Sequence, residues 1–417
     1  MTAAAAGAAE AVEELEALLR AVLPTAWTEL VATGDHEGLA EYLAAADRRE
    51  VDDIVRRVAA EGWLVPEWPT ALGGRALGAD ETVDVRATLA RWRVGTVESA
   101  IGTGWVGPAV LRFAASEVAA ELLPPIARNE VLWCQLFSEP EAGSDLASVR
   151  TRAALEGTAW HLTGRKIWTS RADRAGWGLA VARTDAEVPK HAGLTCFLVD
   201  LAAPGIEIRP ILQMTGDSEF FEVTLDDVVI EDRYRLGEPG QGWGIVRAVL
   251  ALERAAGSGA GAATPGSVVG RTIDEFVAEQ LPGADPVRAG AIARLYVEAR
   301  AIALNNRRNA LLRAAGSNPV ANGTPYNKVL QAEHTKRLQR AILGGGGLAA
   351  VAFPADERAR EYDAWAFLRV QPKTIAGGTS EVLRDQIAER GLGMPRGADP
   401  SKRVAWREFI SSQGGAS

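Results

Sequence analysis

The chain has 417 residues, of which 47% are hydrophobic and 24% charged, and its formal net charge is -9. A chain of this length buries a large core and is expected to form two or three domains. The acidic balance argues against a generally basic nucleic-acid-binding protein, so we expect no nucleic-acid partner. The composition is that of an ordinary soluble protein.

The amino-terminal segment is rich in alanine but soon becomes acidic, at Glu10, Glu13 and Glu14. It lacks the basic segment and the apolar core of a signal peptide. The chain contains no apolar run of about twenty residues, the length that a transmembrane helix needs. We therefore expect a cytoplasmic protein without a membrane partner.

Helical spacing of apolar residues dominates residues 8–128, most clearly in residues 11–22 and 51–58. A cluster of Pro66, Pro69 and two glycines interrupts the helices, which resume near Thr82. Short strand-like segments follow between residues 130 and 236, separated by Gly, Asp and Pro turns; they are residues 160–162, 177–181, 194–199, 205–208 and 221–229.

After Gly240 the chain returns to helix until near Gly391, most clearly in residues 292–304 and 335–343. The order of helices, strands and helices predicts an α+β fold. We place its domains at residues 1–129, 130–238 and 239–417.

Cys134 and Cys196 both lie in apolar runs, so we expect buried free thiols rather than a disulfide. The four histidines show no metal-ligand spacing with each other or with a cysteine. No metal site is expected.

Four segments invite a functional interpretation, and each has a simpler one. Residues 257–262 satisfy a dinucleotide-binding pattern, but a helix precedes them where a strand is required, so a flexible break is favoured. Residues 137–145 form a loop in which Gly143 and Ser144 would let a polar cofactor approach closely, although an ordinary turn also explains them.

The other two segments lie further along the chain. Trp168 stands beside two hydroxyls at the end of a strand, which suits a flat heteroaromatic ring, although a buried tryptophan is the default among 12. Residues 376–381 predict a loop and a helix N-cap, and capping alone explains them.

Several stretches of the chain, in their order along it, resemble the acyl-CoA dehydrogenase family of flavoproteins. The stretches that carry the resemblance are residues 62–66 with 73–75, 138–145, 166–168, 221–223 with 226–228, 242–243, 377–381 and 388–390. Each stretch alone is weakly specific, but together they follow the family's order and spacing over nearly the whole chain.

The resemblance implies bound FAD, an all-α amino-terminal domain, a β middle domain and a carboxyl-terminal four-helix bundle. It implies that Gln135, Phe137 and Ser138 lie along the flavin, with Trp168 against its ring and Ser170 near N5. Gly143 and Ser144 would lie where the cofactor meets the CoA thioester. The adenosine-diphosphate half would be approached by Gly378, Thr379 and Glu381.

The family's reaction, α,β-dehydrogenation of an acyl-CoA, needs a carboxylate that removes the α proton while a hydride leaves to flavin N5. Many members carry this base immediately before the Gly-Thr of the carboxyl-terminal loop, where this chain has Gly377. A subset carries it on the first helix after the β domain, which implies that Glu253 is the base. Arg254 resembles the family's supporting arginine at the substrate.

By helical period Glu253 shares a face with apolar residues such as Ile245 and Val249. A carboxylate on such a face is costly to bury without a purpose. The simpler interpretation is a rim residue paired with a basic group in solvent.

The chain departs from the family in one element. The Arg-x-x-Phe-Gly sequence that reaches a neighbouring subunit's flavin is not recognisable, because Arg271 and Phe276 have a different spacing. Residues 343–347 do resemble the family's glycine-rich segment near a neighbour's FAD. One half of the contact between subunits is therefore expected to be missing, or supplied by a different chain of a homo- or hetero-oligomer, dimeric or tetrameric.

The resemblance is to a divergent bacterial branch that acts on bulky CoA thioesters, including steroid side chains, and an electron-transferring flavoprotein is the family's expected electron acceptor. Two alternative functions keep the fold. One is a flavin-dependent monooxygenase, and the other is a non-catalytic subunit of a heteromeric acyl-CoA dehydrogenase.

Overall fold

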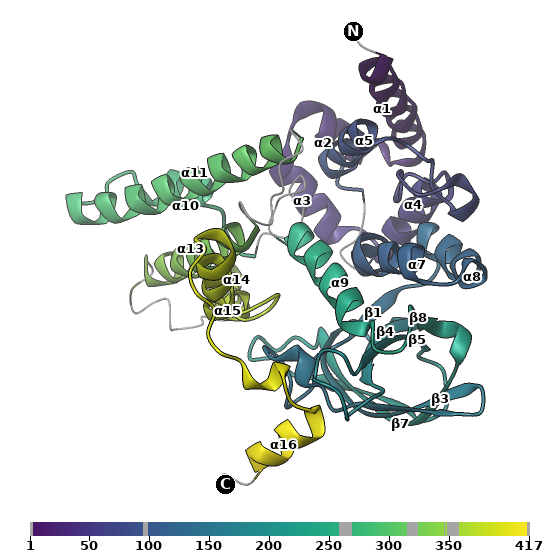
Figure 1. Cartoon of the computed structure of the whole chain (residues 1–417). Coiled ribbons are helices and arrows are strands. Elements are labelled where there is room, and N and C mark those ends of the chain that lie inside the picture. The colour runs from purple at the N-terminus through teal and green to yellow at the C-terminus, as the bar shows by residue number, and fades with distance from the viewer. Residues whose placement is uncertain are drawn as a thin grey trace. The chain divides into compact units, whose positions relative to one another are not determined.

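The computed structural model describes residues 3–94, 99–257, 269–314, 324–345, 347 and 358–414 (Figure 1). The chain forms two compact units. The first comprises Met1–Ile211, Glu219–Val249 and Asp399–Ser417, and the second comprises Leu212–Ser218 and Leu250–Ala398. None of the described helices combines the length and the apolar character that crossing a membrane requires.

Helices form the beginning of the first unit, as the spacing of apolar residues predicts. They are α1 Ala3–Val22, α2 Thr25–Thr33, α3 His36–Ala45, α4 Arg48–Ala60, α5 Ala79–Arg91, α6 Ser99–Ile101, α7 Gly107–Phe113 and α8 Ser116–Ala127. Leu15, Leu19, Trp27 and Val58 are fully buried in their shared core. The predicted break between α4 and α5 is real, and a side chain on Gly74 would overlap the backbone of Trp68.

An eight-stranded sheet follows in the same unit. Its strands are β1 Trp133–Leu136, β2 Arg152–Glu156, β3 Ala159–Ser170, β4 Trp177–Arg183, β5 Leu194–Asp200, β6 Ile206–Ile211, β7 Phe220–Glu231 and β8 Arg235–Leu236. The order is β6-β7-β3-β2-β4-β5-β8, and β1 pairs with β4. The five strand-like segments of the sequence lie in these strands, except that Gly205 stands in the turn before β6.

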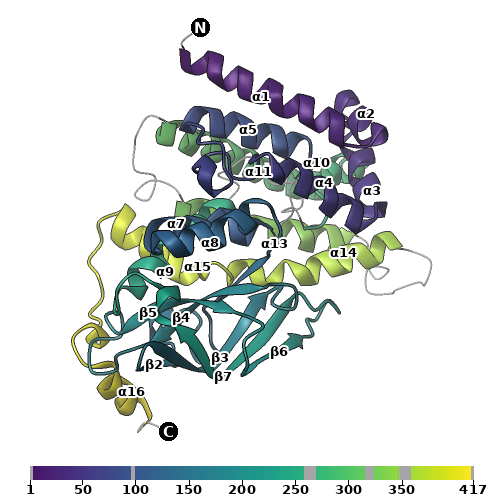
Figure 2. The ribbon, with the colours of Figure 1, turned by 90° about the vertical axis from the view of Figure 1, so that its right-hand side faces the viewer.

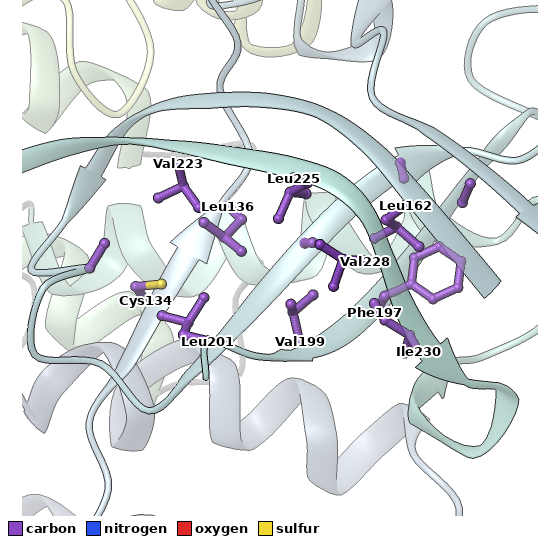
Figure 3. Packing of buried hydrophobic residues seen from close by; sticks show 14 of the residues in the cluster. Cys134, Leu136, Leu162, Phe197, Val199, Leu201, Val223, Leu225, Val228 and Ile230 are labelled. Atoms are coloured by element: carbon purple, nitrogen blue, oxygen red, sulfur yellow. The ribbon is translucent and has the colours of Figure 1, made fainter. Parts of the chain in front are cut away.

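Alternate residues of the strands build one apolar core, because successive side chains of a strand point to opposite faces. Leu136, Leu162, Phe197 and Val223 from four strands point toward one another in it (Figure 3). Cys134 lies in the same cluster, and both cysteines are buried free thiols, as predicted. Burial raises the pKa of Cys196 to about 12, so this thiol stays protonated and unreactive.

Helices return in the second unit. They are α10 Ile273–Gln280, α11 Pro286–Ala314, α13 Thr324–Gly345, α14 Arg358–Arg369 and α15 Ser380–Gln386, while α9 Gly242–Gly257 has residues in both units. Helix α13 packs against α11, α14 and α15 (Figure 2). Phe276, Ile292, Leu338 and Ile342 form a buried cluster. The break at residues 257–262 lies, from residue 258 on, outside the described residues.

One helix was not expected from the sequence. Helix α16, Trp406–Gly414, belongs to the first unit and packs beside its sheet. The amides of Trp406 and Arg407 donate to the carbonyl oxygens of Val188 and Ala186 at 2.9 and 3.0 Å. The prediction that helix ends near Gly391 was therefore wrong.

Candidate active site

Trp168 projects from a break in the pairing of β3 with β7. Lys166 pairs with Val223 and Thr169 with Phe221, so two residues of β3 face one of β7, which is a β-bulge. The bulge gives Trp168 a left-handed φ of 61° and leaves its side chain 56% exposed, with the ring of Phe220 packed edge-on at 6.1 Å. A bulky aromatic residue rarely adopts a positive φ, so the surrounding structure must hold Trp168 in this conformation.

A buried ion pair fixes the bulge beside the loop that follows β1. The Lys166 Nζ atom lies 2.7 Å from Glu139 Oε1 and donates to the carbonyl oxygens of Val181 and Phe137 at 2.7 and 3.3 Å. The next amide, that of Ile167, donates to the carbonyl oxygen of Ser138 at 2.9 Å. Residues 135–138 and 168–170, which the sequence assigns to one cofactor, therefore lie side by side.

The two buried charges of this pair stabilise each other. Burial alone would raise the pKa of Glu139, but the Lys166 ammonium and hydrogen bonds that include the amide of Arg150 lower it below its usual value. Burial lowers the pKa of Lys166, and the Glu139 carboxylate opposes that shift. Sequence reasoning missed this pair, although the two residues lie in two of the stretches that carry the resemblance.

The loop that carries Gly143 and Ser144 is exposed at its tip and anchored on both sides. Before the tip, the backbone groups of Glu139 and Ala142 bond to each other at 3.1 and 3.0 Å. After the tip, the Asp145 carboxylate accepts from Lys190 Nζ at 2.7 Å. Apart from its two chain neighbours, none of the described residues has a heavy atom within 4 Å of the place where a Cβ of residue 143 would be, so a ligand can approach the backbone here.

The other residues of the predicted flavin site are partly accessible, with one exception. Gln135 and Ser170 are half-buried, whereas the side chain of Phe137 is only 2% exposed. The hydroxyl of Thr169, next to Trp168, is buried and has no hydrogen-bond partner within the described part of the chain. An exposed indole, an unsatisfied hydroxyl and a bare glycine backbone fit the flat ring and polar groups of FAD.

Glu253 and Gly377 come together in the second unit. Val249 and Ile245, one and two helical turns earlier on α9, are buried, and Glu253 itself is half-buried. A Cβ atom built on Gly377 would lie 3.8 Å from Glu253 Oε1. The carboxylate thus faces the position that a side chain at residue 377 would occupy. Arg254 lies in α9, but its side chain is outside the described residues.

The predicted adenosine-diphosphate residues surround the start of α15. Thr379 is the N-cap, as predicted, and its hydroxyl accepts from the amide of Val382 at 3.1 Å. The carbonyl oxygen of Gly378 accepts from Lys328 Nζ at 2.6 Å. The Glu381 side chain is 77% exposed. Thr379 therefore has a capping role whatever it binds.

Arg271 is fully engaged within its own unit. Its guanidinium bonds both oxygens of Asp363, at 3.0 and 2.6 Å, and also pairs with Glu279. Phe276 is buried in the apolar cluster of α10, α11 and α13. The glycine-rich segment at residues 343–347 is described only in part, since Gly346 lies outside the described residues.

Three family models match the chain. They are the amino-terminal domain of acyl-CoA dehydrogenase at residues 28–130, its middle domain at residues 134–228 and its carboxyl-terminal domain at residues 240–392. Acyl-CoA dehydrogenase IpdE1 of Mycobacterium tuberculosis is 35% identical over 86% of this chain and 91% of its own length. Acyl-CoA dehydrogenase FadE34 of the same organism is 39% identical over 80% of this chain, which spans only 45% of FadE34.

A solved structure described as Tcur3481-Tcur3483 steroid ACAD has a TM-score of 0.73 and 26% identity, and the match covers 94% of this chain and 98% of that one. These relationships confirm the predicted fold, cofactor and enzyme class. Because the family models together match most of the chain, the protein belongs to the acyl-CoA dehydrogenase family, whose enzymes bind FAD.

Proposed function

We propose that the protein oxidises a bulky acyl-CoA thioester to its α,β-unsaturated product, with Glu253 as the base. The observation that carries this proposal is the approach of the Glu253 carboxylate to Gly377. The two positions at which the family carries its base meet at one place, and this chain has a carboxylate at one of them and glycine at the other. That arrangement supports a single base delivered from α9.

In the proposed reaction the Glu253 carboxylate takes the α proton, and the electrons of that C–H bond form the new double bond as the β hydrogen leaves with its electron pair. FAD, when bound, accepts this hydride. Trp168 offers its exposed ring to the flavin face, while Gly143 and Ser144 offer backbone donors and a hydroxyl where the thioester meets the cofactor.

Glu253→Gln tests the base. We expect the variant to retain flavin and acyl-CoA binding while the rate of anaerobic flavin reduction falls by about 10²–10⁴-fold, the usual contribution of a general base. Glu389→Gln, which makes the same charge change at another half-buried position of this unit, should leave the rate unchanged. Normal reduction in Glu253→Gln would rule out Glu253 as the base.

A relocated base sharpens this test. The double variant Glu253→Gly and Gly377→Glu moves the carboxylate from residue 253 to residue 377, the position that faces it. We expect the rate of flavin reduction to recover only partly relative to Glu253→Gly alone, because the φ of 67° at residue 377 disfavours a side chain by about 1–2 kcal/mol.

The alternative function is tested separately. Oxygen consumption driven by supplied reduced flavin, without anaerobic reduction of the flavin by acyl-CoA, would favour a monooxygenase.

We infer that a different chain completes the cofactor site of this protein. Arg271 supports this inference, because its guanidinium is held by Asp363 and Glu279 and is not available to a neighbour's flavin. The name of the relative Tcur3481-Tcur3483 joins two proteins and calls them a steroid ACAD, which also supports a steroid-bearing acyl group as substrate.

Purification of this chain alone tests the assembly. We expect weak flavin loading that rises when the partner chain is co-expressed. The visible spectrum measures the flavin content, and mass photometry measures the size of the assembly. A yellow, fully loaded homo-oligomer that a CoA thioester reduces would contradict the need for a partner. Comparing a steroid side-chain thioester with a straight-chain one of equal carbon number then tests the acyl group.

A further inference from the structure

Helix α13 faces the segment that carries Gly377 with a row of charged side chains. Lys328 Nζ donates to the carbonyl oxygen of Gly378 at 2.6 Å, and Lys336 Nζ donates to the Thr374 hydroxyl at 3.2 Å. Between them, Glu333 accepts from the Ser380 hydroxyl at 3.1 Å. The loop between residues 374 and 380 is thus tied to one rigid helix at three points.

The loop needs such ties, because its backbone has little preference for the conformation that it adopts. Gly377 and Gly378 have φ values of 67° and 103°, a region that glycine enters freely but also leaves freely. Of the three ties, that of Lys328 is the one made to these glycines. Its partner carbonyl adjoins the residue that faces the Glu253 carboxylate.

Lys328 is suited to this task by its surroundings. Its side chain is half-buried, and burial lowers the pKa of its ammonium, while the charges of Glu333 on the same helix and Glu381 on α15 oppose that shift. A charged donor to a carbonyl oxygen makes a stronger hydrogen bond than a neutral one. Loss of the proton would weaken the tie without removing the side chain.

We propose that Lys328 is a positioning residue for the Glu253 site: its hydrogen bond to Gly378 holds the Gly377–Gly378 turn, and thereby the surface against which the Glu253 carboxylate lies. This inference rests on the proposed role of Glu253. It adds a residue from α13 to the machinery, at a position that no motif of the sequence marks.

The test compares Lys328→Met and Lys328→Arg with Arg340→Met, the removal of an exposed cation on the same helix, in the flavin-loaded complex. We expect Lys328→Met to bind acyl-CoA like the wild type but to reduce flavin about tenfold or more slowly, because small misplacements of reacting groups have such costs. Lys328→Arg should restore most of the rate, and Arg340→Met should change it little.

The pH dependence separates positioning from a merely structural role. The rate of the wild type should decline as the pH rises through the lowered pKa of Lys328, whereas in Lys328→Arg, whose guanidinium stays charged, this decline should move to higher pH. An unchanged alkaline decline in Lys328→Arg would overturn the proposal, and this comparison holds even if Lys328→Met does not fold. If Glu253→Gln is inactive but Lys328→Met reduces flavin normally, only the role of Lys328 fails.

Discussion

At the scale of single residues, Lys166 has the largest predicted effect on stability. Its ammonium and the Glu139 carboxylate are both nearly inaccessible, so removal of one leaves the other charge buried without a partner. Lys166→Met should lower the free energy of unfolding by about 3–5 kcal/mol. Urea unfolding measures this loss, with the exposed neighbour Arg165→Met as a control that should change it by less than about 1 kcal/mol.

The same pair predicts a pH dependence of stability. The pKa of Glu139 is lowered on folding, so its stabilisation is complete above the ordinary value of 4.5 and is lost as the pH falls through the lowered value. In the double variant Lys166→Met and Glu139→Gln, the free energy of unfolding should fall less than in the wild type as the pH is lowered. That double variant should also be more stable than Lys166→Met alone, and no recovery would contradict the buried-pair account.

Several site residues could be named from the sequence while their conformations could not. The motif at residues 166–168 identified Trp168, but its exposure follows from the register of β7 and from the contact of Ile167 with Ser138, both of which are distant in sequence. The closeness of Glu253 and Gly377 could not be predicted for the same reason, since these residues are also distant in sequence. A residue such as Lys328, which acts on backbone rather than on a ligand, leaves no local pattern to recognise.

At the scale of elements, strands and long helices could be predicted because their apolar residues follow the period of the element. Helix α16 could not, since its residues pack through Trp406 and Phe409 onto cations instead of onto an apolar surface. Trp406 covers the guanidinium of Arg183 at 4.1 Å, and Phe409 covers the Lys190 ammonium at 5.4 Å. Arg183 in turn bonds the carbonyl oxygens of Ala147 and Val149.

Helix α16 is therefore predicted to stabilise the loop of Ser144 through Arg183, which Trp406 covers. Trp406→Ala removes a cation–π contact of about 0.5–2 kcal/mol, so we expect faster proteolysis within residues 141–149 and weaker acyl-CoA binding, with the flavin reduction rate at saturation little changed. Arg407→Ala, its exposed neighbour, is the matched control. Equal protease resistance in the two variants would show that α16 does not support the loop.

At the scale of the whole molecule, the family could be predicted because its motifs are distributed over most of the chain and occur in order. The domain boundaries at residues 129 and 238 remain predictions, and the two compact units of the structure are divided differently, with the first regaining residues 399–417. The element for contacting a neighbour was not recognisable because Arg271 and Phe276 have a different spacing, and in the structure Arg271 is paired with Asp363 of its own chain.

The return of residues 399–414 to the first unit has a consequence for biosynthesis. The sheet and the loop of Ser144 leave the ribosome long before α16 is translated, and until then Arg183 and Lys190 have no aromatic cover. A nascent chain stalled before Asp399 would carry the strands but a loosely supported loop. The support of this loop by α16 would then begin only once residues 406–414 have been synthesised.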